Sequence, residues 1–137
     1  MNKNKIFAIC KLVFLYMLRI LNSISMNKTI ESIEKEITSW PYVTSGVHRF
    51  GGIDFRINKR ELGHIHSIGL ADLPFPMKIR DELVNSGHVK PHHILPKSGW
   101  VSYWFENNPE KDIQKVVELF RLRYDQLKPK EQSESNK

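Results

Sequence analysis

Two histidines separated by one residue are the part of this sequence best suited to chemistry. His64 and His66 lie in the segment RELGHIHSIG, whose composition and alternation predict a β-strand. Side chains two positions apart on a strand project from the same face, so both imidazoles and Leu62 are expected on one face. Imidazole titrates near neutral pH, and such a pair suits acid–base chemistry on a small ligand or coordination of a divalent metal ion.

Three further segments could supply partners for this pair. A loop bounded by prolines carries His92 and His93, and the turn-rich segment GLADLPFP carries Asp72. The aromatic segment WVSYWF begins with Trp100, and aromatic walls with a few polar groups are typical of pockets for small organic ligands. The predicted catalytic residues are His64, His66 and His92, and the predicted ligand-binding residues are Asp72, His93 and Trp100.

The same residues also fit a purely structural role. Histidines on a strand can hydrogen-bond to neighbouring strands without any ligand, and Trp100 and Trp104 can simply fill a core. His48 and His88 have the character of surface histidines. No metal site is predicted, because the sequence has no HExxH motif and its single cysteine, Cys10, excludes a four-cysteine zinc module.

The net charge of +6 is concentrated near the ends of the chain. Residues 1–26 carry four cations and no acid, whereas residues 27–127 carry 14 basic and 13 acidic residues. Phosphate binding needs a clustered excess of cations, so nucleic acid is not an expected partner of the body of the protein. The sequence does not predict the oligomeric state.

Residues 1–26 form a basic, apolar leader with three interpretations. Residues 5–22 place their polar side chains in one arc of a helix, as in a helix that lies on a membrane or in a protein groove. A signal or spanning segment is a second interpretation, although Lys11 and Arg19 interrupt the apolar run. In the third, Met26 is the start and the leader is an upstream extension. We expect a cytoplasmic protein, with membrane contact through residues 5–22.

The remaining periodicities predict one α+β domain over residues 27–127. Helices are expected over 29–40, with Thr29 as a cap for its start, over 77–86, with Gly87 as its stop, and over 109–127, with Asn108 as its cap and Pro109 at its first position. Strands are expected on both sides of Gly51-Gly52, at RELGHIHSIG and at WVSYWF. The predicted order is α-β-β-β-α-β-α, a mostly antiparallel sheet of about four strands with helices on one face. The tail, 128–137, is expected to be disordered.

The block from Glu61 to Phe105 resembles the luciferase-like domain family, which is named after the fungal luciferase. It reads ELGHIHSIGLADLPFPMKIRDELVNSGHVKPHHILPKSGWVSYWF, and it is similar to the family pattern ELGHxH, GxADLPFP, DELV, PHH, LP and SGW. The C-terminal RLRYDQL fits as well. The resemblance implies a compact domain that binds, or oxidises with molecular oxygen, a small aromatic or enolic ligand without a metal or flavin cofactor.

If that chemistry carries over, His64, His66 or His92 would deprotonate an acidic enol. Whether the chain is an enzyme is left open by the residues themselves. A fainter similarity, of residues 92–127 to small bacterial double-wing proteins, offers the alternative of a nucleic-acid-binding or interaction module without catalytic activity.

Overall fold

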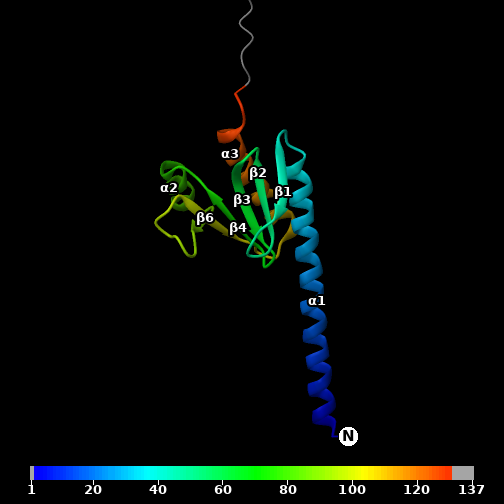
Figure 1. Ribbon diagram of the computed structural model, residues 1–137. Coiled ribbons are helices and arrows are strands. Elements are labelled where there is room, and N and C mark those ends of the chain that lie inside the picture. Colours follow the sequence, from blue (N-terminus) through cyan, green and yellow to red (C-terminus); the bar gives the residue numbers. More distant parts are fainter. Residues whose placement is uncertain (1, 131–137) are drawn as a thin grey trace, which may run out of the picture.

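The computed structural model describes residues 2–130, and within them the chain forms three helices and a six-stranded antiparallel sheet (Figure 1). The predicted α+β class is confirmed, but the sheet has six strands rather than about four. Its strand order is β1-β2-β3-β4-β6-β5. The elements are α1 (Lys3–Thr38), β1 (Val43–Val47), β2 (Ile53–Ile57), β3 (Arg60–His66), β4 (Leu70–Pro74), α2 (Met77–Asn85), β5 (Lys90–Pro91), β6 (Trp100–Trp104) and α3 (Pro109–Leu127).

The two additional strands lie in segments expected to be irregular. The turn-rich segment GLADLPFP forms β4, which is buried over its first four residues and pairs with β3 on one side and β6 on the other. Burial between two neighbours provides the hydrogen bonds and packing that the local composition does not predict. Strand β5 has only two residues and pairs with β6 in the loop that was expected before WVSYWF.

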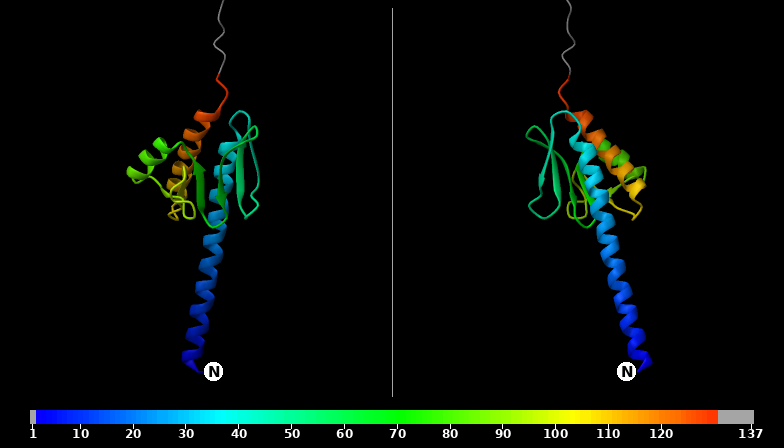
Figure 2. Two further views of the ribbon diagram at one scale, coloured as in Figure 1. Left: turned by 60° about the vertical axis from the view of Figure 1, so that its left-hand side comes forward. Right: turned by 90° about the vertical axis from the view of Figure 1, so that its right-hand side faces the viewer.

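The helices cover one face of the sheet. Helices α1 and α3 run side by side behind it (Figure 2). Helix α2 lies beside α3, where Leu83 and Leu119 line a shared crevice. The ring of Phe55 on β2 packs against Phe120 of α3 at 5.0 Å between centroids. The alternation of β2 therefore puts Asp54 and Arg56 on the opposite face, away from the core.

Helix α1 is much longer than the helix expected over 29–40. Thr29 was expected to cap its start, but Thr29 lies inside the helix, where its hydroxyl donates to the carbonyl of Ser25. Helix-compatible residues precede it without a break, so there is no end for Thr29 to cap. The helix also runs straight through residue 26, where the leader was expected to end, and the division of the chain at that residue stays a prediction.

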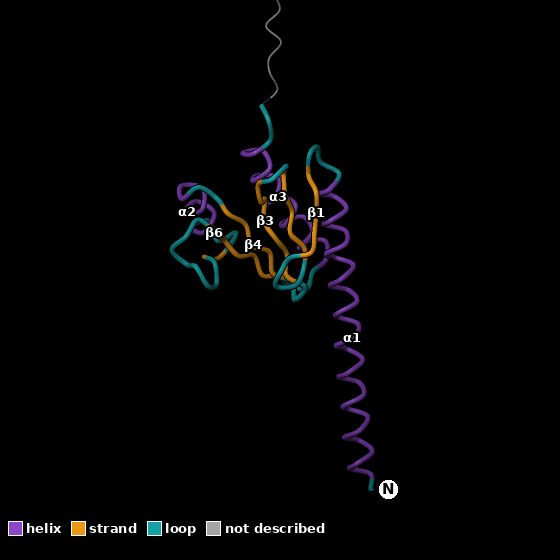
Figure 3. The backbone as a smooth tube through the Cα atoms, in the orientation of Figure 1, coloured by secondary structure: helices purple, strands orange, loops and turns teal. Residues whose placement is uncertain are grey.

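The part of α1 before the domain extends away from it (Figure 3). Residues 2–25 are exposed, and this stretch is apolar and long enough to cross a membrane by length and composition. The last turns of α1 enter the core through Ile30, Ile33 and Ile37. The C-terminal end of α1 is thus packed in the core, whereas its N-terminal part is apolar and exposed to solvent.

The ends of the other helices match the expectation. The Asn108 side chain accepts a hydrogen bond from the backbone of Lys111, with Pro109 at the first position of α3. Helix α2 is followed by Gly87 in a left-handed conformation. Residues 128–130 have no regular structure, and the rest of the predicted disordered tail, 131–137, lies outside the described residues.

A bulge between β2 and β3 determines which side chains reach the open face. Phe55 pairs with Gly63 but Arg56 pairs with Glu61, so Leu62 is an extra residue in β3. Leu62 is buried in the hydrophobic core, and the expectation that it shares a face with the histidines is wrong. Bulges re-aim side chains next to functional sites. Here the bulge brings Glu61 to the histidine face.

Gly63 is expected to tolerate no side chain. A Cβ at this position would lie 2.7 Å from the carbonyl oxygen of Asp72 and 2.9 Å from Leu73 Cγ. Neither can move without displacing β4, so Gly63→Ala should lower the free energy of unfolding by about 1–3 kcal/mol, as measured by urea denaturation. The control is Gly46→Ala, whose Cβ meets the movable carboxylate of Asp54. Equal stability of the two variants would contradict the close packing of β3 on β4.

Candidate functional site

A buried aspartate surrounded by histidines lies on the sheet face opposite the helices. Asp72 on β4 pairs directly with His64 on β3 and with Ser102 on β6, so the three side chains share this face. His92 and His93 reach the same place from the loop after β5. The side chains bound an open hollow of about 280 Å³, lined by His48, Phe50, His64, His66, Asp72, His92, His93, Ile94, Leu95 and Trp100.

The carboxylate of Asp72 is the centre of this cluster and is fully buried. Its Oδ2 lies 2.9 Å from His66 Nε2, 3.5 Å from His64 Nε2 and 3.4 Å from His92 Nε2. Its Oδ1 accepts a hydrogen bond of 2.5 Å from the Ser102 hydroxyl. Burial alone would raise the pKa of Asp72, but its contacts with His64, Ser102 and His66 outweigh burial and lower this pKa. Asp72 is therefore a carboxylate anion.

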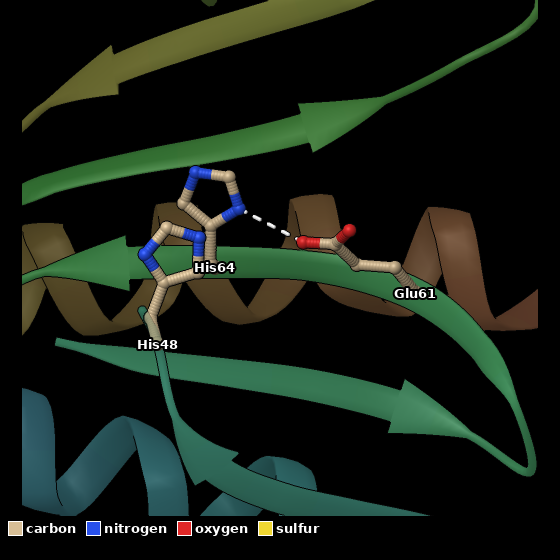
Figure 4. Close-up of side chains that lie close together, drawn as sticks. All are labelled: His48, Glu61 and His64. Atoms are coloured by element: carbon tan, nitrogen blue, oxygen red, sulfur yellow. Dashed lines mark hydrogen bonds and ion pairs between the residues drawn. The ribbon is translucent and has the colours of Figure 1, made fainter. Parts of the chain in front are cut away.

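His64 lies between two carboxylates. Its Nδ1 is 2.9 Å from Glu61 Oε1, the contact drawn in Figure 4, and its Nε2 faces Asp72. Burial would lower the pKa of His64, but the contacts with Asp72 and Glu61 outweigh burial and raise it. The ring of His48 stacks on that of His64 at 4.1 Å between centroids, and burial together with the charge of His64 lowers the pKa of His48.

His92 has a tautomer fixed by its own loop. Its Nδ1 accepts hydrogen bonds from the backbone N–H groups of Ile94 and Leu95, at 3.2 and 3.0 Å. An acceptor nitrogen carries no proton, so the neutral ring carries its proton on Nε2, which faces Asp72. Burial lowers the pKa of His92, against the opposing charge of Asp72, and so favours this neutral form. His92 is thus a hydrogen-bond donor at the floor of the hollow.

The rim and walls of the hollow combine aromatic and apolar groups. Trp100 lies against the rings of His64 and His92, at 5.4 and 6.0 Å between centroids. Phe50, Ile94 and Leu95 are exposed side chains on the other sides. His93 is partly exposed at the rim, with Nδ1 3.3 Å from the Ser102 hydroxyl. A flat organic molecule could contact the walls and the polar floor together.

The cluster also contains ligand sets of the kind that hold metal ions. His64, His66 and Asp72 each offer a ligand atom within 4.8 Å of the others, and so do Asp72, His92 and His93. A third such set consists of His48, Glu61 and His64, shown in Figure 4. Two histidines with one carboxylate are a donor set that suits a transition-metal ion.

One protein family model matches the part of the chain that carries the hollow. Residues 59–123, just under half of the chain, match the family model described as Luciferase domain. This part of the chain is similar to the luciferase-like domain family. The resemblance seen in the sequence is confirmed by this match. Neither a curated protein nor a solved structure matches the chain.

The part that matches the luciferase-like domain model carries the floor of the hollow. It includes all six predicted site residues, which the fold brings together around Asp72. His48, Phe50 and the whole of α1 lie outside the matched part. The apolar leader and part of the rim of the hollow are therefore features of this chain beyond the matched luciferase-like region.

Three residues of the cluster were not predicted from the sequence. Glu61 reaches His64 only because of the bulge, and Ser102 reaches Asp72 only because β6 pairs with β4. His48 has the character of a surface histidine, yet it stacks on His64. The period-two alternation of β6 was the one available signal, since it places Ser102 on the same face as Trp100 and Trp104.

Proposed function

We propose that the hollow of this luciferase-like domain binds a small aromatic or enolic ligand as its anion, and that the ligand is oxidised there by molecular oxygen. The observation that carries the proposal is the convergence of three histidine rings on one buried carboxylate at the floor of an open hollow. Its volume of about 280 Å³ suits a ligand with one ring or two small rings.

The polarity of the hollow supports an anionic ligand. The carboxylate of Asp72 already accepts contacts from His66 and Ser102, so its oxygens do not face the ligand unpartnered. The Nε2–H of His92 and the half-exposed ring of His93 remain as groups that can donate to a ligand oxygen. An enol of a hydroxylated pyrone is acidic, and donors held in a partly buried site stabilise its enolate more than donors in bulk water do.

The shape of the walls supports a flat ligand. Trp100 offers an aromatic surface beside the histidines, and Phe50, Ile94 and Leu95 are apolar. An electron-rich enolate between such walls is a reasonable partner for oxygen, the reaction that the family resemblance implies. The described structure has no observation that favours the alternative of a nucleic-acid-binding module.

The test uses triacetic acid lactone, a hydroxylated pyrone, as the probe. Calorimetric titration into the full chain in a mild detergent should show one binding site. His92→Gln should weaken binding by about tenfold or more, because a charge-assisted hydrogen bond to the enolate contributes about 1.5–3 kcal/mol. Oxygen uptake, followed with an electrode, should accompany binding in the wild type.

The matched control is His88→Gln, which changes an exposed histidine away from the hollow. It should bind the pyrone as the wild type does. Equal affinities of the wild type, His92→Gln and His88→Gln would show that the pyrone does not use the hollow, and an absence of binding in all three would remove the proposal for this ligand class.

We further infer that the protein is membrane-associated through residues 5–22. These residues are exposed and mostly apolar, with the unbroken run from Leu12 to Leu18, while Lys5, Lys11 and Arg19 fall in one arc of the helix. A helix with so wide an exposed apolar surface needs an apolar environment on that side. The exposed stretch of α1, Lys3–Ser25, is about 34 Å long at 1.5 Å per residue, close to the thickness of a bilayer core.

A further inference from the structure

Three ring nitrogens approach one oxygen of Asp72, but they cannot all hydrogen-bond to it well. A carboxylate oxygen has two lone pairs, and only the His66 contact, at 2.9 Å, has hydrogen-bond geometry among the described contacts. His64 Nε2 and His92 Nε2 remain at 3.5 and 3.4 Å. The ring nitrogens therefore converge on a region beside Oδ2 without being fully satisfied by it.

The distances between these atoms fit the edges of a coordination polyhedron. Metal–nitrogen and metal–oxygen bonds of about 2.1 Å place neighbouring ligand atoms about 3.0 Å apart in an octahedron and about 3.4 Å apart in a tetrahedron. Asp72 Oδ2 lies 2.9 Å from His66 Nε2 and 3.5 Å from His64 Nε2. The two edges that meet at Asp72 Oδ2 thus fit, and the three ligand atoms all lie within 4.8 Å of one another, so a small cation could contact all three after adjustment of the two histidine rings.

The groups behind these atoms have the arrangement of an outer ligand shell. A histidine that binds a metal through Nε2 usually donates its Nδ1–H to a carboxylate, and ligating carboxylates are themselves hydrogen-bonded. His64 Nδ1 faces Glu61 at 2.9 Å, and Asp72 Oδ1 accepts from Ser102. In the tautomer with its proton on Nδ1, His64 would present an Nε2 lone pair beside the Asp72 oxygen, which is the form that a metal ion needs.

His92 is distinguished from the other two histidines by its tautomer. Its Nδ1 accepts two backbone N–H groups, so its Nε2 carries the proton and has no lone pair for a metal. This leaves two imidazoles and one carboxylate as ligands. It leaves His92 to donate a hydrogen bond toward whatever occupies the hollow.

We propose that His64, His66 and Asp72 bind a divalent first-row transition-metal ion, best matched by Fe(II), at the floor of the hollow. Two histidines and one carboxylate on one side of the ion, with the remaining positions open, are the ligand set of non-haem Fe(II) sites. The open positions would face the hollow. The proposal departs from the expectation of a metal-free site, and it concerns the same hollow as the proposed function without requiring the organic ligand.

The experiment measures binding of the ion alone. The full chain, stripped with EDTA in a mild detergent, is titrated with Co(II), followed by its visible absorption, and with Fe(II) under anaerobic conditions. We expect one ion per chain, with Mg²⁺ failing to compete because the site is rich in nitrogen. His66→Gln should weaken Co(II) binding at least about 100-fold. Glu61→Gln, which keeps the ligands, should weaken it about 10- to 100-fold.

Two controls separate this site from ordinary binding by surface histidines. His88→Gln should leave Co(II) affinity unchanged, and His92→Gln should change it less than about threefold. Failure to bind one Co(II) per chain, or retention of affinity by His66→Gln, overturns the proposal.

The pyrone titration is repeated on the EDTA-treated protein. If the protein binds the pyrone but no metal ion, the proposed function stands and the metal site is rejected. If it binds the metal ion but no pyrone, the metal site stands and the proposed ligand class is rejected.

Discussion

Asp72→Asn is expected to lower the free energy of unfolding by about 3 kcal/mol and to abolish binding of the pyrone probe. Removing one partner of a buried charged network leaves the other charges uncompensated, at a cost of about 3–5 kcal/mol. Here the asparagine amide would face His64, His66 and His92 with half of the acceptor capacity of the carboxylate. Urea denaturation and calorimetry of the same preparation measure both effects.

The control for this variant is Asp81→Asn. Asp81 is half-exposed and pairs with Arg80 at 2.7 Å, and exposed ion pairs contribute about 0–1 kcal/mol. Asp81→Asn should therefore remain near wild-type stability and should bind the pyrone normally. If Asp72→Asn were as stable as Asp81→Asn and still bound the probe, the carboxylate would not organise the cluster.

The second large effect is expected at the exposed part of α1. The full chain should float with lipid vesicles in a density gradient and should resist extraction by alkaline carbonate. Phe14→Asp with Leu18→Asp should move the protein to the soluble fraction, because a charged residue at the centre of a membrane helix costs about 2.5–3.5 kcal/mol. Both positions are exposed, so the substitutions should leave the fold of the domain unchanged.

The matched control is Glu31→Gln, an exposed position on α1 within the domain. It should float with the wild type. Recovery of the unmodified chain in the soluble fraction would contradict membrane association. A mature chain that begins just after Ser25, seen by mass spectrometry, would instead identify the leader as a cleaved signal.

The elements with local signals were predictable from the sequence. Helix α3 has a cap and a continuous apolar stripe, α2 is followed by Gly87, and Gly51-Gly52 separates two strands. Strand β4 was not predictable, because the glycine and prolines of the segment GLADLPFP are typical of turns and the pairing of β4 with β3 and β6 exists only in three dimensions. The length of α1 was missed because a good internal cap, Thr29, suggested a start where the helix continues.

The candidate site was predictable in its residue types but not in its arrangement. The histidine pair, Asp72 and the loop histidines stand out by type and spacing, and the fold brings them together. That Asp72 would be the centre depends on the register of β4 against β3 and β6, which no local pattern specifies. The role of Glu61 depends on one extra residue in β3, which reverses the alternation on which the sequence argument rested.

Nuclear magnetic resonance of the histidine rings tests the central proposal most directly. Ring nitrogen–proton correlation spectra of the isotope-labelled full chain are recorded before and after addition of triacetic acid lactone. We predict that the ring signals of His64, His66 and His92 shift together in proportion to the bound fraction, while those of His88 stay in place. Unchanged signals of His64, His66 and His92 under saturating pyrone would contradict binding at the buried carboxylate.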